Sequence, residues 1–362
     1  MWPRMGKRTA NRGGMVEVKA RLEQLAGAFE EGAYEDVVEG AEVLLGEAPG
    51  QPEALHFRAA ALAALGRLEE AFEAYGRALK AAPEDLEILL GAAECLVGGA
   101  GDDRAAVEEA LGLCERGRRL AQRAGDVELL FEFLLLEGVG LNQVGECGRA
   151  LESLEAALKH VPRSLEARLE RAVALFELCR FGEAQEAFEA VLKEAPEEAW
   201  AHHYLGLMAE RRGDAKEARR RFSKAQALAP EEFPPPVELG EAEFDQALEA
   251  AVKALPEHVK KYLDNVTIAV EDIPADEDLK GESPPLSPCI LGVFRGSPVG
   301  EQNRILEGFD PYPASIVLYQ KNLERFARTR EELIEQIGIT VMHEVGHLMG
   351  LDEDDLWERG LD

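Results

Sequence analysis

The residues best suited to carry out chemistry are His343, Glu344 and His347, which stand in the run His-Glu-Val-Gly-His near the end of the chain. Two residues four positions apart lie on one face of a helix, about 6 Å apart, so both imidazoles can reach one Zn²⁺ ion. The glutamate between them then lies beside an open coordination position, where it can serve as general base toward a water molecule. The pattern therefore predicts metal-assisted hydrolysis of a peptide bond, with His343 and His347 as zinc ligands and Glu344 as the catalytic residue.

The residues around this motif predict a long helix that ends just after it. Thr329 and Glu332 form a capping box, and the apolar residues that follow are spaced for one buried helix face. Gly350 is a natural helix stop, and an acidic run follows it directly. We expect the chain to turn back at Gly350 so that an acidic residue approaches the metal.

Upstream of this helix, the sequence predicts a small α+β domain over residues 241–362. An amphipathic helix is expected over 241–256, and β-branched or alternating runs predict strands over 265–271, 289–294 and 315–319. The strand over 289–294 is the candidate edge strand for an extended substrate. Residues 272–288 are acidic and rich in proline, so we expect a loop there.

The N-terminal part of the chain has an internal repeat of 34 residues. The prolines that mark it are separated by 34, 79, 34 and 34 residues, and they are Pro49, Pro83, Pro162, Pro196 and Pro230. At fixed distances before these prolines lie a turn glycine, as at Gly32 and Gly213, and two small or aliphatic residues. This period and pattern resemble the tetratricopeptide repeat, a helix-turn-helix unit that stacks into a solenoid.

The repeats divide the chain into segments. We expect a disordered segment over residues 1–17, about six repeat units over 18–232, a stiff Pro-rich linker over 233–240 and the α+β domain after it. The interval of 79 residues predicts an enlarged third unit near 86–130, with its extra residues in or beside Gly98–Asp102. The chain is thus expected to be mostly α-helical, an α-solenoid followed by a small α+β domain.

Composition narrows the classes of partner. A net charge of −30 disfavours nucleic acid and anionic membranes and favours a basic peptide or protein. No apolar run is long enough to cross a membrane, and the N-terminal residues do not form a signal peptide. The five cysteines are an odd number without a paired motif, which indicates reduced thiols in a cytoplasmic protein.

The C-terminal domain resembles the minimal zincin-like metallopeptidase family of bacteria over about 243–357. The matching words are Leu255-Pro-Glu, the strand segments 263–272, 291–296 and 316–319, and the run 340–351 that contains the two histidines. The family pattern H-E-x-x-H-x-x-G-x-x-D implies a third zinc ligand at Glu353, where this chain has Glu in place of Asp. Asp352 and Asp354 remain alternatives for that ligand. Tyr312, Tyr319 and Arg295 are weak candidates for the residue that stabilises the oxyanion.

Two functions remain open at this point. In the first, the protein is a zinc-dependent peptidase whose tetratricopeptide repeats recruit a protein substrate or partner. In the second, it is a latent or non-catalytic scaffold whose repeats mediate protein–protein interaction and whose zincin-like domain only binds zinc. A purely structural zinc site is usually closed by four protein ligands and has no need of Glu344, so the sequence favours the peptidase.

Overall fold

The computed structural model describes residues 7–101, 103–263, 266–281, 283–296, 314–352 and 355–356. The chain divides into two compact units, the first ending at Ala174 and the second beginning at Leu175. None of the described helices is long and apolar enough to cross a membrane.

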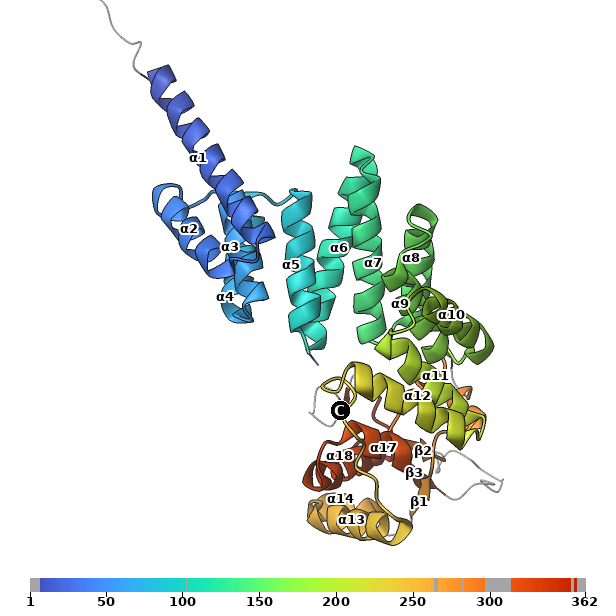
Figure 1. Ribbon diagram of the computed structural model, residues 1–362. Coiled ribbons are helices and arrows are strands. Elements are labelled where there is room, and N and C mark those ends of the chain that lie inside the picture. The colour runs from blue at the N-terminus through green and yellow to red at the C-terminus, as the bar shows by residue number, and fades with distance from the viewer. Residues whose placement is uncertain are drawn as a thin grey trace, which may run out of the picture. The chain divides into compact units, whose positions relative to one another are not determined.

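Helices α1 to α12 carry the repeats (Figure 1). Their bounds are Lys7–Glu30, Tyr34–Glu47, Pro52–Ala64, Leu68–Ala81, Leu86–Gly99, Arg104–Ala124, Val127–Gln143, Cys147–His160, Leu165–Glu177, Phe181–Glu194, Ala199–Arg211 and Ala215–Leu228. The small residues of the repeat pattern, such as Ala71, Ala78 and Ala150, are completely buried. They keep neighbouring helices close together, as the pattern predicts.

The turn between the two helices of a unit requires a left-handed backbone. Gly32, Gly66 and Gly213 have φ of 75°, and Gly145 has φ of 78°. Only glycine adopts this conformation without steric strain. The unit that ends at Pro196 has Cys179 at the corresponding position, where φ is 55°, so the repeat geometry overrides the preference of the residue.

Two expectations about the repeats differ from the structure. Helix α1 begins at Lys7 within the segment 1–17 that we expected to be disordered. A helix already anchored by packing extends at little free-energy cost per residue, which explains the extension. The extra residues of the long interval lie mainly in α6 and α7, which have 21 and 17 residues, rather than in the turn after Gly99.

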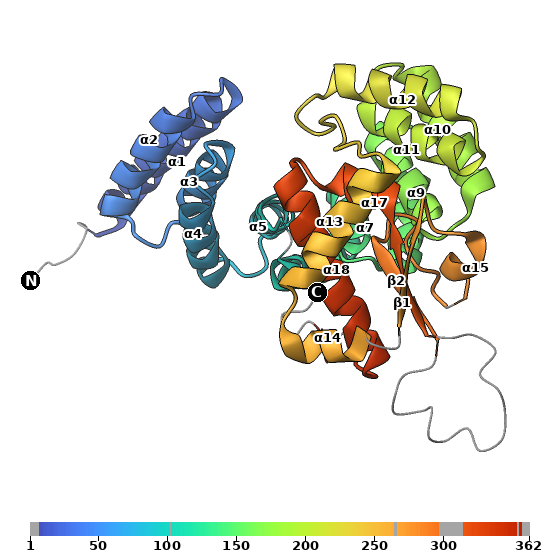
Figure 2. The same ribbon diagram turned by 90° about the horizontal axis from the view of Figure 1, so that it is seen from below.

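The second unit contains α10 to α12 and a small sheet with its helices (Figure 2). The further elements are α13 (Glu241–Ala254), α14 (Glu257–Leu263), β1 (Thr267–Glu271), α15 (Asp276–Leu279), β2 (Gly292–Arg295), β3 (Ser315–Tyr319), α17 (Gln320–Phe326) and α18 (Arg330–Leu348). The predicted helix at 241–256 and the predicted strands are present with bounds shifted by a few residues. Helices α14 and α17 were not predicted, and α15 lies in the segment expected to be a loop.

The sheet of the described residues has three strands in the order β1-β3-β2. Strand β1 runs parallel to β3, and β2 runs antiparallel to it. Helices α13 and α18 pack on one face, where Phe244, Ile316, Leu318, Ile337 and Val341 form a buried core. Among the described residues, β1 and β2 each pair on one side only, so β2 stays the candidate edge strand near 289–294.

Candidate metal centre

Helix α18 carries the predicted zinc motif and is held firmly in place. Thr329 caps its first turn by accepting a hydrogen bond from the Glu332 amide at 3.1 Å. Its apolar residues Leu333, Ile337 and Val341 are completely buried against the core, which fixes the rotation of the helix. That rotation leaves His343 and His347 half-buried on one side.

The two histidines converge as a pair of metal ligands requires. Their Nε2 atoms are 3.1 Å apart, and their rings are inclined by 82°. His347 Nδ1 lies 3.1 Å from the carbonyl oxygen of Leu351. A carbonyl only accepts, so Nδ1 carries the proton, and in the neutral ring Nε2 presents a lone pair.

This arrangement fits a zinc ion. Two nitrogens that each lie about 2.0–2.1 Å from one tetrahedral zinc are about 3.3 Å apart, close to the observed separation. Among the residues that the structure describes, no group of three or more His, Cys, Asp or Glu side chains could hold a metal. The predicted third ligand Glu353 and its neighbour Asp354 lie outside the described residues.

Glu344 lies in a protected position between the helix and an edge strand. Its exposed fraction is 4%. A Cβ atom placed on Gly292 of β2 would lie 3.4 Å from Glu344 Oε1 and 2.7 Å from Thr340 Cγ2. The absence of a side chain at Gly292 therefore allows β2 to lie directly against the carboxylate of Glu344.

The chain after α18 turns back across the helix, as expected at Gly350. Gly350 has φ of 85°, and the Leu351 amide donates to the carbonyl oxygen of Gly346 at 3.1 Å. Leu356 is completely buried, and its Cδ2 atom would lie only 2.2 Å from a Cβ placed on Gly346. Residues on both sides of Glu353 thus lie against the helix that carries the two histidines.

Asp352 already has a structural contact. Its Oδ1 atom accepts a hydrogen bond from the Asp355 amide at 2.9 Å, and the residue is exposed. This contact caps the short turn that leads to Leu356.

The structure places Arg295 and Tyr319 away from Glu344. Gly292 pairs with Leu318 on the sheet face that packs against α18, so Arg295 and Tyr319 point to the opposite face. The Arg295 guanidinium donates to Asp278 at 2.6 and 2.8 Å, and the Tyr319 hydroxyl donates to the same carboxylate at 2.9 Å. The expectation that either residue stabilises an oxyanion is therefore wrong, while Tyr312 lies outside the described residues.

The cluster around Asp278 was not predicted, because its members are distant in sequence. Burial alone would raise the pKa of Asp278, but the hydrogen bonds from Arg295 and Tyr319 lower it below its usual range. Arg295 also donates to Glu271 at 2.8 Å. The cluster ties α15 to all three strands on the sheet face opposite α18.

Comparison with known proteins supports this architecture. Residues 263–361 match the zincin-like metallopeptidase family, and residues 52–95 and 142–210 match tetratricopeptide repeat families. No curated protein matches the sequence.

Two solved structures share the repeat fold. One is from a functional characterisation of pilF from Pseudomonas aeruginosa, with 18% identity and a TM-score of 0.50, covering 65% of this chain and 99% of the other. The second is PilW, described as a widely conserved type IV pilus biogenesis factor, with 20% identity and a TM-score of 0.51, covering 59% of this chain and 94% of the other. The chain therefore joins tetratricopeptide repeats to a domain of the zincin-like metallopeptidase family.

Proposed function

We propose that the protein is a zinc-dependent peptidase, with His343 and His347 as zinc ligands. The observation that carries this proposal is the convergence of their Nε2 atoms at 3.1 Å beside the buried Glu344. The match of residues 263–361 to the metallopeptidase family supports the same chemistry.

A bound zinc ion would polarise the scissile carbonyl group and activate water for attack on it. In this proposal, Glu344 takes a proton from the attacking water on its carboxylate and later delivers it to the leaving amine. Its low exposure supports this role, because a carboxylate screened from bulk solvent transfers its proton within the site. The hydrogen bond from His347 Nδ1 to Leu351 keeps that imidazole in the orientation and tautomer that metal binding requires.

We assign the third ligand to Glu353. The return of the chain over Gly346 supports this assignment, because it brings Leu351 and Leu356 against the helix on either side of that position. The contact of Asp352 with the Asp355 amide supports it further, since it engages the preceding carboxylate.

Strand β2 is our candidate for substrate binding. Among the residues that the structure describes, it pairs on one side only, and its other side is our candidate for pairing with an extended peptide. Its Gly292 lies next to Glu344, which would bring a peptide bound along β2 close to the proposed general base.

The repeats are proposed to recruit a protein or peptide. Glutamates on α5, α7 and α9 interact electrostatically across neighbouring helices, as Glu94 does with Glu132 and Glu166. Burial, together with this repulsion, raises the pKa of Glu94 and of Glu132. A basic partner would relieve the repulsion, so we favour a Lys- or Arg-rich segment over an acidic one.

The test is the zinc content and peptidase activity of matched variants. We expect about one zinc per chain in the wild type and in Glu344→Ala, and none in His347→Ala or His343→Ala. Cleavage of a fluorescent basic peptide library should be lost in all three variants. Wild-type cleavage by Glu344→Ala would refute the assignment of the base, and zinc without any cleavage would favour the scaffold reading.

A further inference from the structure

One face of α11, in the last repeat, is covered by residues from the C-terminal part of the chain. Phe233, from the linker, stacks on His203 with ring centroids 4.6 Å apart and meets Trp200 edge-on at 4.8 Å. Phe233 is 9% exposed. The linker therefore begins as a packed segment of the second unit rather than as a free spacer.

The same linker continues onto α17. The amide of Val237 donates to the carbonyl oxygen of Glu324, and the amide of Leu239 donates to the Glu324 carboxylate, each at 3.0 Å. Gln320 donates to the carbonyl oxygen of Leu239 at 3.1 Å. The linker thus packs on α11 at one end and is hydrogen-bonded to α17 at the other.

Glu210, in the last turn of α11, makes the most enclosed ionic contact of this region. Its carboxylate pairs with Arg325 of α17, and Lys321 of the same helix lies 3.8 Å away. The side chains of Glu210 and Arg325 are only 16% and 19% exposed. The Arg325 guanidinium also lies 5.3 Å from the ring centroid of Phe222 in α12, so α17 contacts both helices of the repeat.

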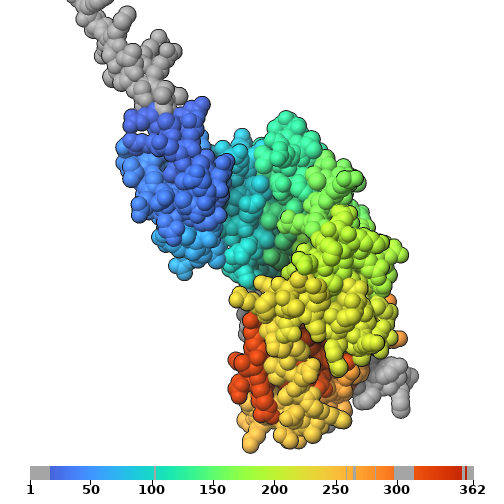
Figure 3. Space-filling view, in the orientation of Figure 1, coloured from blue at the N-terminus to red at the C-terminus, as the bar shows by residue number. Residues whose placement is uncertain are grey.

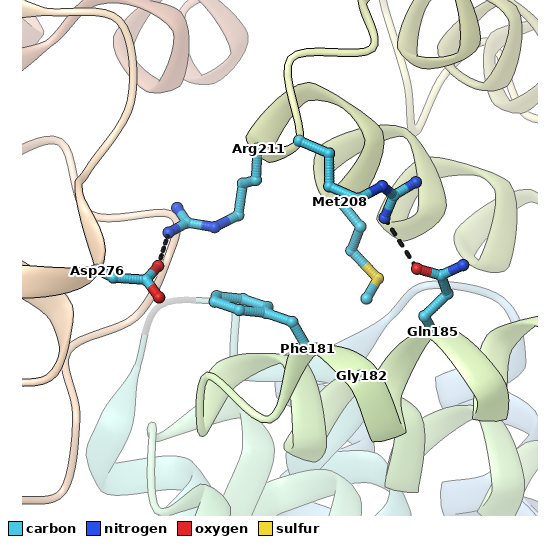
Figure 4. A pocket seen from close by; sticks show the side chains of 7 residues that line it. Phe181, Gly182, Gln185, Met208, Arg211 and Asp276 are labelled. Atoms are coloured by element: carbon cyan, nitrogen blue, oxygen red, sulfur yellow. Dashed lines mark hydrogen bonds and ion pairs between the residues drawn. The ribbon is translucent and has the colours of Figure 1, made fainter.

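Arg211, the next residue, contacts the start of α15 and the segment before it. It pairs with Asp276 at 2.7 Å and donates to the carbonyl oxygen of Pro274 at 3.0 Å. A cavity of about 300 Å³ lies beside this pair, between α10, α11 and α15 (Figure 4). Asp276 is 51% exposed there, so this pair is more strongly screened by solvent than the pair of Glu210 with Arg325.

We propose that the last repeat is an internal docking site whose ligand is the metallopeptidase domain of the same chain. The docked element is α17, and the pair Glu210–Arg325 anchors it. In the space-filling view, the yellow atoms that follow the last repeat in the chain lie against its yellow-green atoms (Figure 3). This repeat therefore holds the peptidase in place, and recruitment of a partner falls to the repeats before it.

The docking site is connected to the proposed general base, Glu344, through two neighbouring strands. Helix α17 starts at Gln320, directly after Tyr319 at the end of the central strand β3. Strand β3 pairs with β2, which contacts Glu344 at Gly292. Glu210 and Arg325 are accordingly positioning residues, which act on the site through β3. This last step rests on the proposed peptidase function, whereas the docking itself does not.

The experiment is a double-mutant cycle in the full-length chain with Glu210→Gln, Arg325→Met and the two combined. Hydrogen exchange of the α17 amides reports docking, and α3 to α6 provide an internal reference. Each single change removes the nearest partner of the remaining buried charge, so we expect exchange in α17 to rise about tenfold or more. Exchange in the double variant should be no faster than in either single variant, because both charges of the pair are removed together. The matched control is Glu217→Gln, since Glu217 pairs with Arg220 and Arg221 of its own helix.

Unchanged exchange in α17, or strictly additive effects in the double variant, would overturn the docking site. Turnover of the fluorescent basic peptide library, measured per bound zinc, then tests whether Glu210 and Arg325 position the catalytic site. We expect turnover to fall in the single variants while zinc content stays at wild-type level. Wild-type turnover in a variant whose α17 amides exchange faster would overturn the positioning role. If the wild type cleaves nothing, the proposed function fails, and exchange in α17 still decides the docking.

Discussion

A methyl group at Gly292 should separate the edge strand from the helix that carries Glu344. In Gly292→Ala, the new Cβ would lie 2.7 Å from Thr340 Cγ2, where carbon atoms normally approach to about 3.5–4.0 Å. Thr340 cannot rotate away freely, because its hydroxyl donates to the carbonyl oxygen of Gln336 at 2.8 Å. The strand or the helix must therefore move by about 1 Å.

A displacement of this size should affect both stability and catalysis. Overpacking of this kind costs about 1–3 kcal/mol, which corresponds to a loss of several degrees in the unfolding midpoint of the second unit. A shift of about 1 Å in a reacting group lowers the rate by about 100-fold. We therefore expect kcat/KM of Gly292→Ala, loaded with zinc, to fall by about 100-fold.

Thr340→Ser offers a matched compensating change, because it removes Cγ2 and keeps the hydroxyl. In the double variant, the nearest atoms to the new Cβ are Val317 O at 3.1 Å and Glu344 Oε1 at 3.4 Å, so shifts of a few tenths of an ångström suffice. We expect the double variant to recover to within about tenfold of the wild type. Thermal unfolding and peptide turnover are the measurements. A Gly292→Ala variant that melts and cleaves like the wild type would refute the contact between β2 and α18.

Three further predictions concern other contacts. Gly346→Ala should displace Leu356 from α18 and weaken zinc binding by about tenfold or more in a chelator competition assay, with Leu356→Ala partly restoring it. Burial among aromatic rings and the nearby Arg325 lower the pKa of His203 to about 4, while the unfolded value is 6.5. The stability that this neutral ring contributes is present above pH 6.5 and is lost as the pH falls toward 4. His203→Phe should therefore make the free energy of unfolding less dependent on pH in this range. Chemical unfolding at several pH values measures that free energy. Gly117→Ala places a Cβ 2.2 Å from the Phe133 ring and should lower the stability of the first unit by about 1–3 kcal/mol in thermal unfolding, whereas Gly112→Ala, which has open space, should not.

Sequence reasoning worked best where the information lies within one element or one repeat. The spacing of His343 and His347 fixes their common helix face, and the structure brings their Nε2 atoms together as that spacing predicts. The period of the prolines likewise predicted the turns at glycines such as Gly32 and Gly213, whereas the left-handed turn at Cys179 was not predicted.

The arrangement around these local patterns depends on contacts between distant residues. No sequence signal showed that Gly292 would lie under Glu344, or that Arg295 would bind Asp278 on the opposite face of the sheet. Both outcomes follow from the order and register of the strands, which are set by packing across the whole domain.

The sequence by itself determined that this chain has helical repeats and a capped helix, on which two histidines have the spacing of metal ligands and a glutamate lies between them. These features are encoded in short periodic patterns, because a helix repeats every 3.6 residues regardless of its surroundings. Only the tertiary structure decided that β2 closes over Glu344 and that the last repeat packs against α17 through Glu210 and Arg325. Those contacts join residues 52 and 115 positions apart, and their pairing depends on the free energy of the assembled core rather than on any local preference.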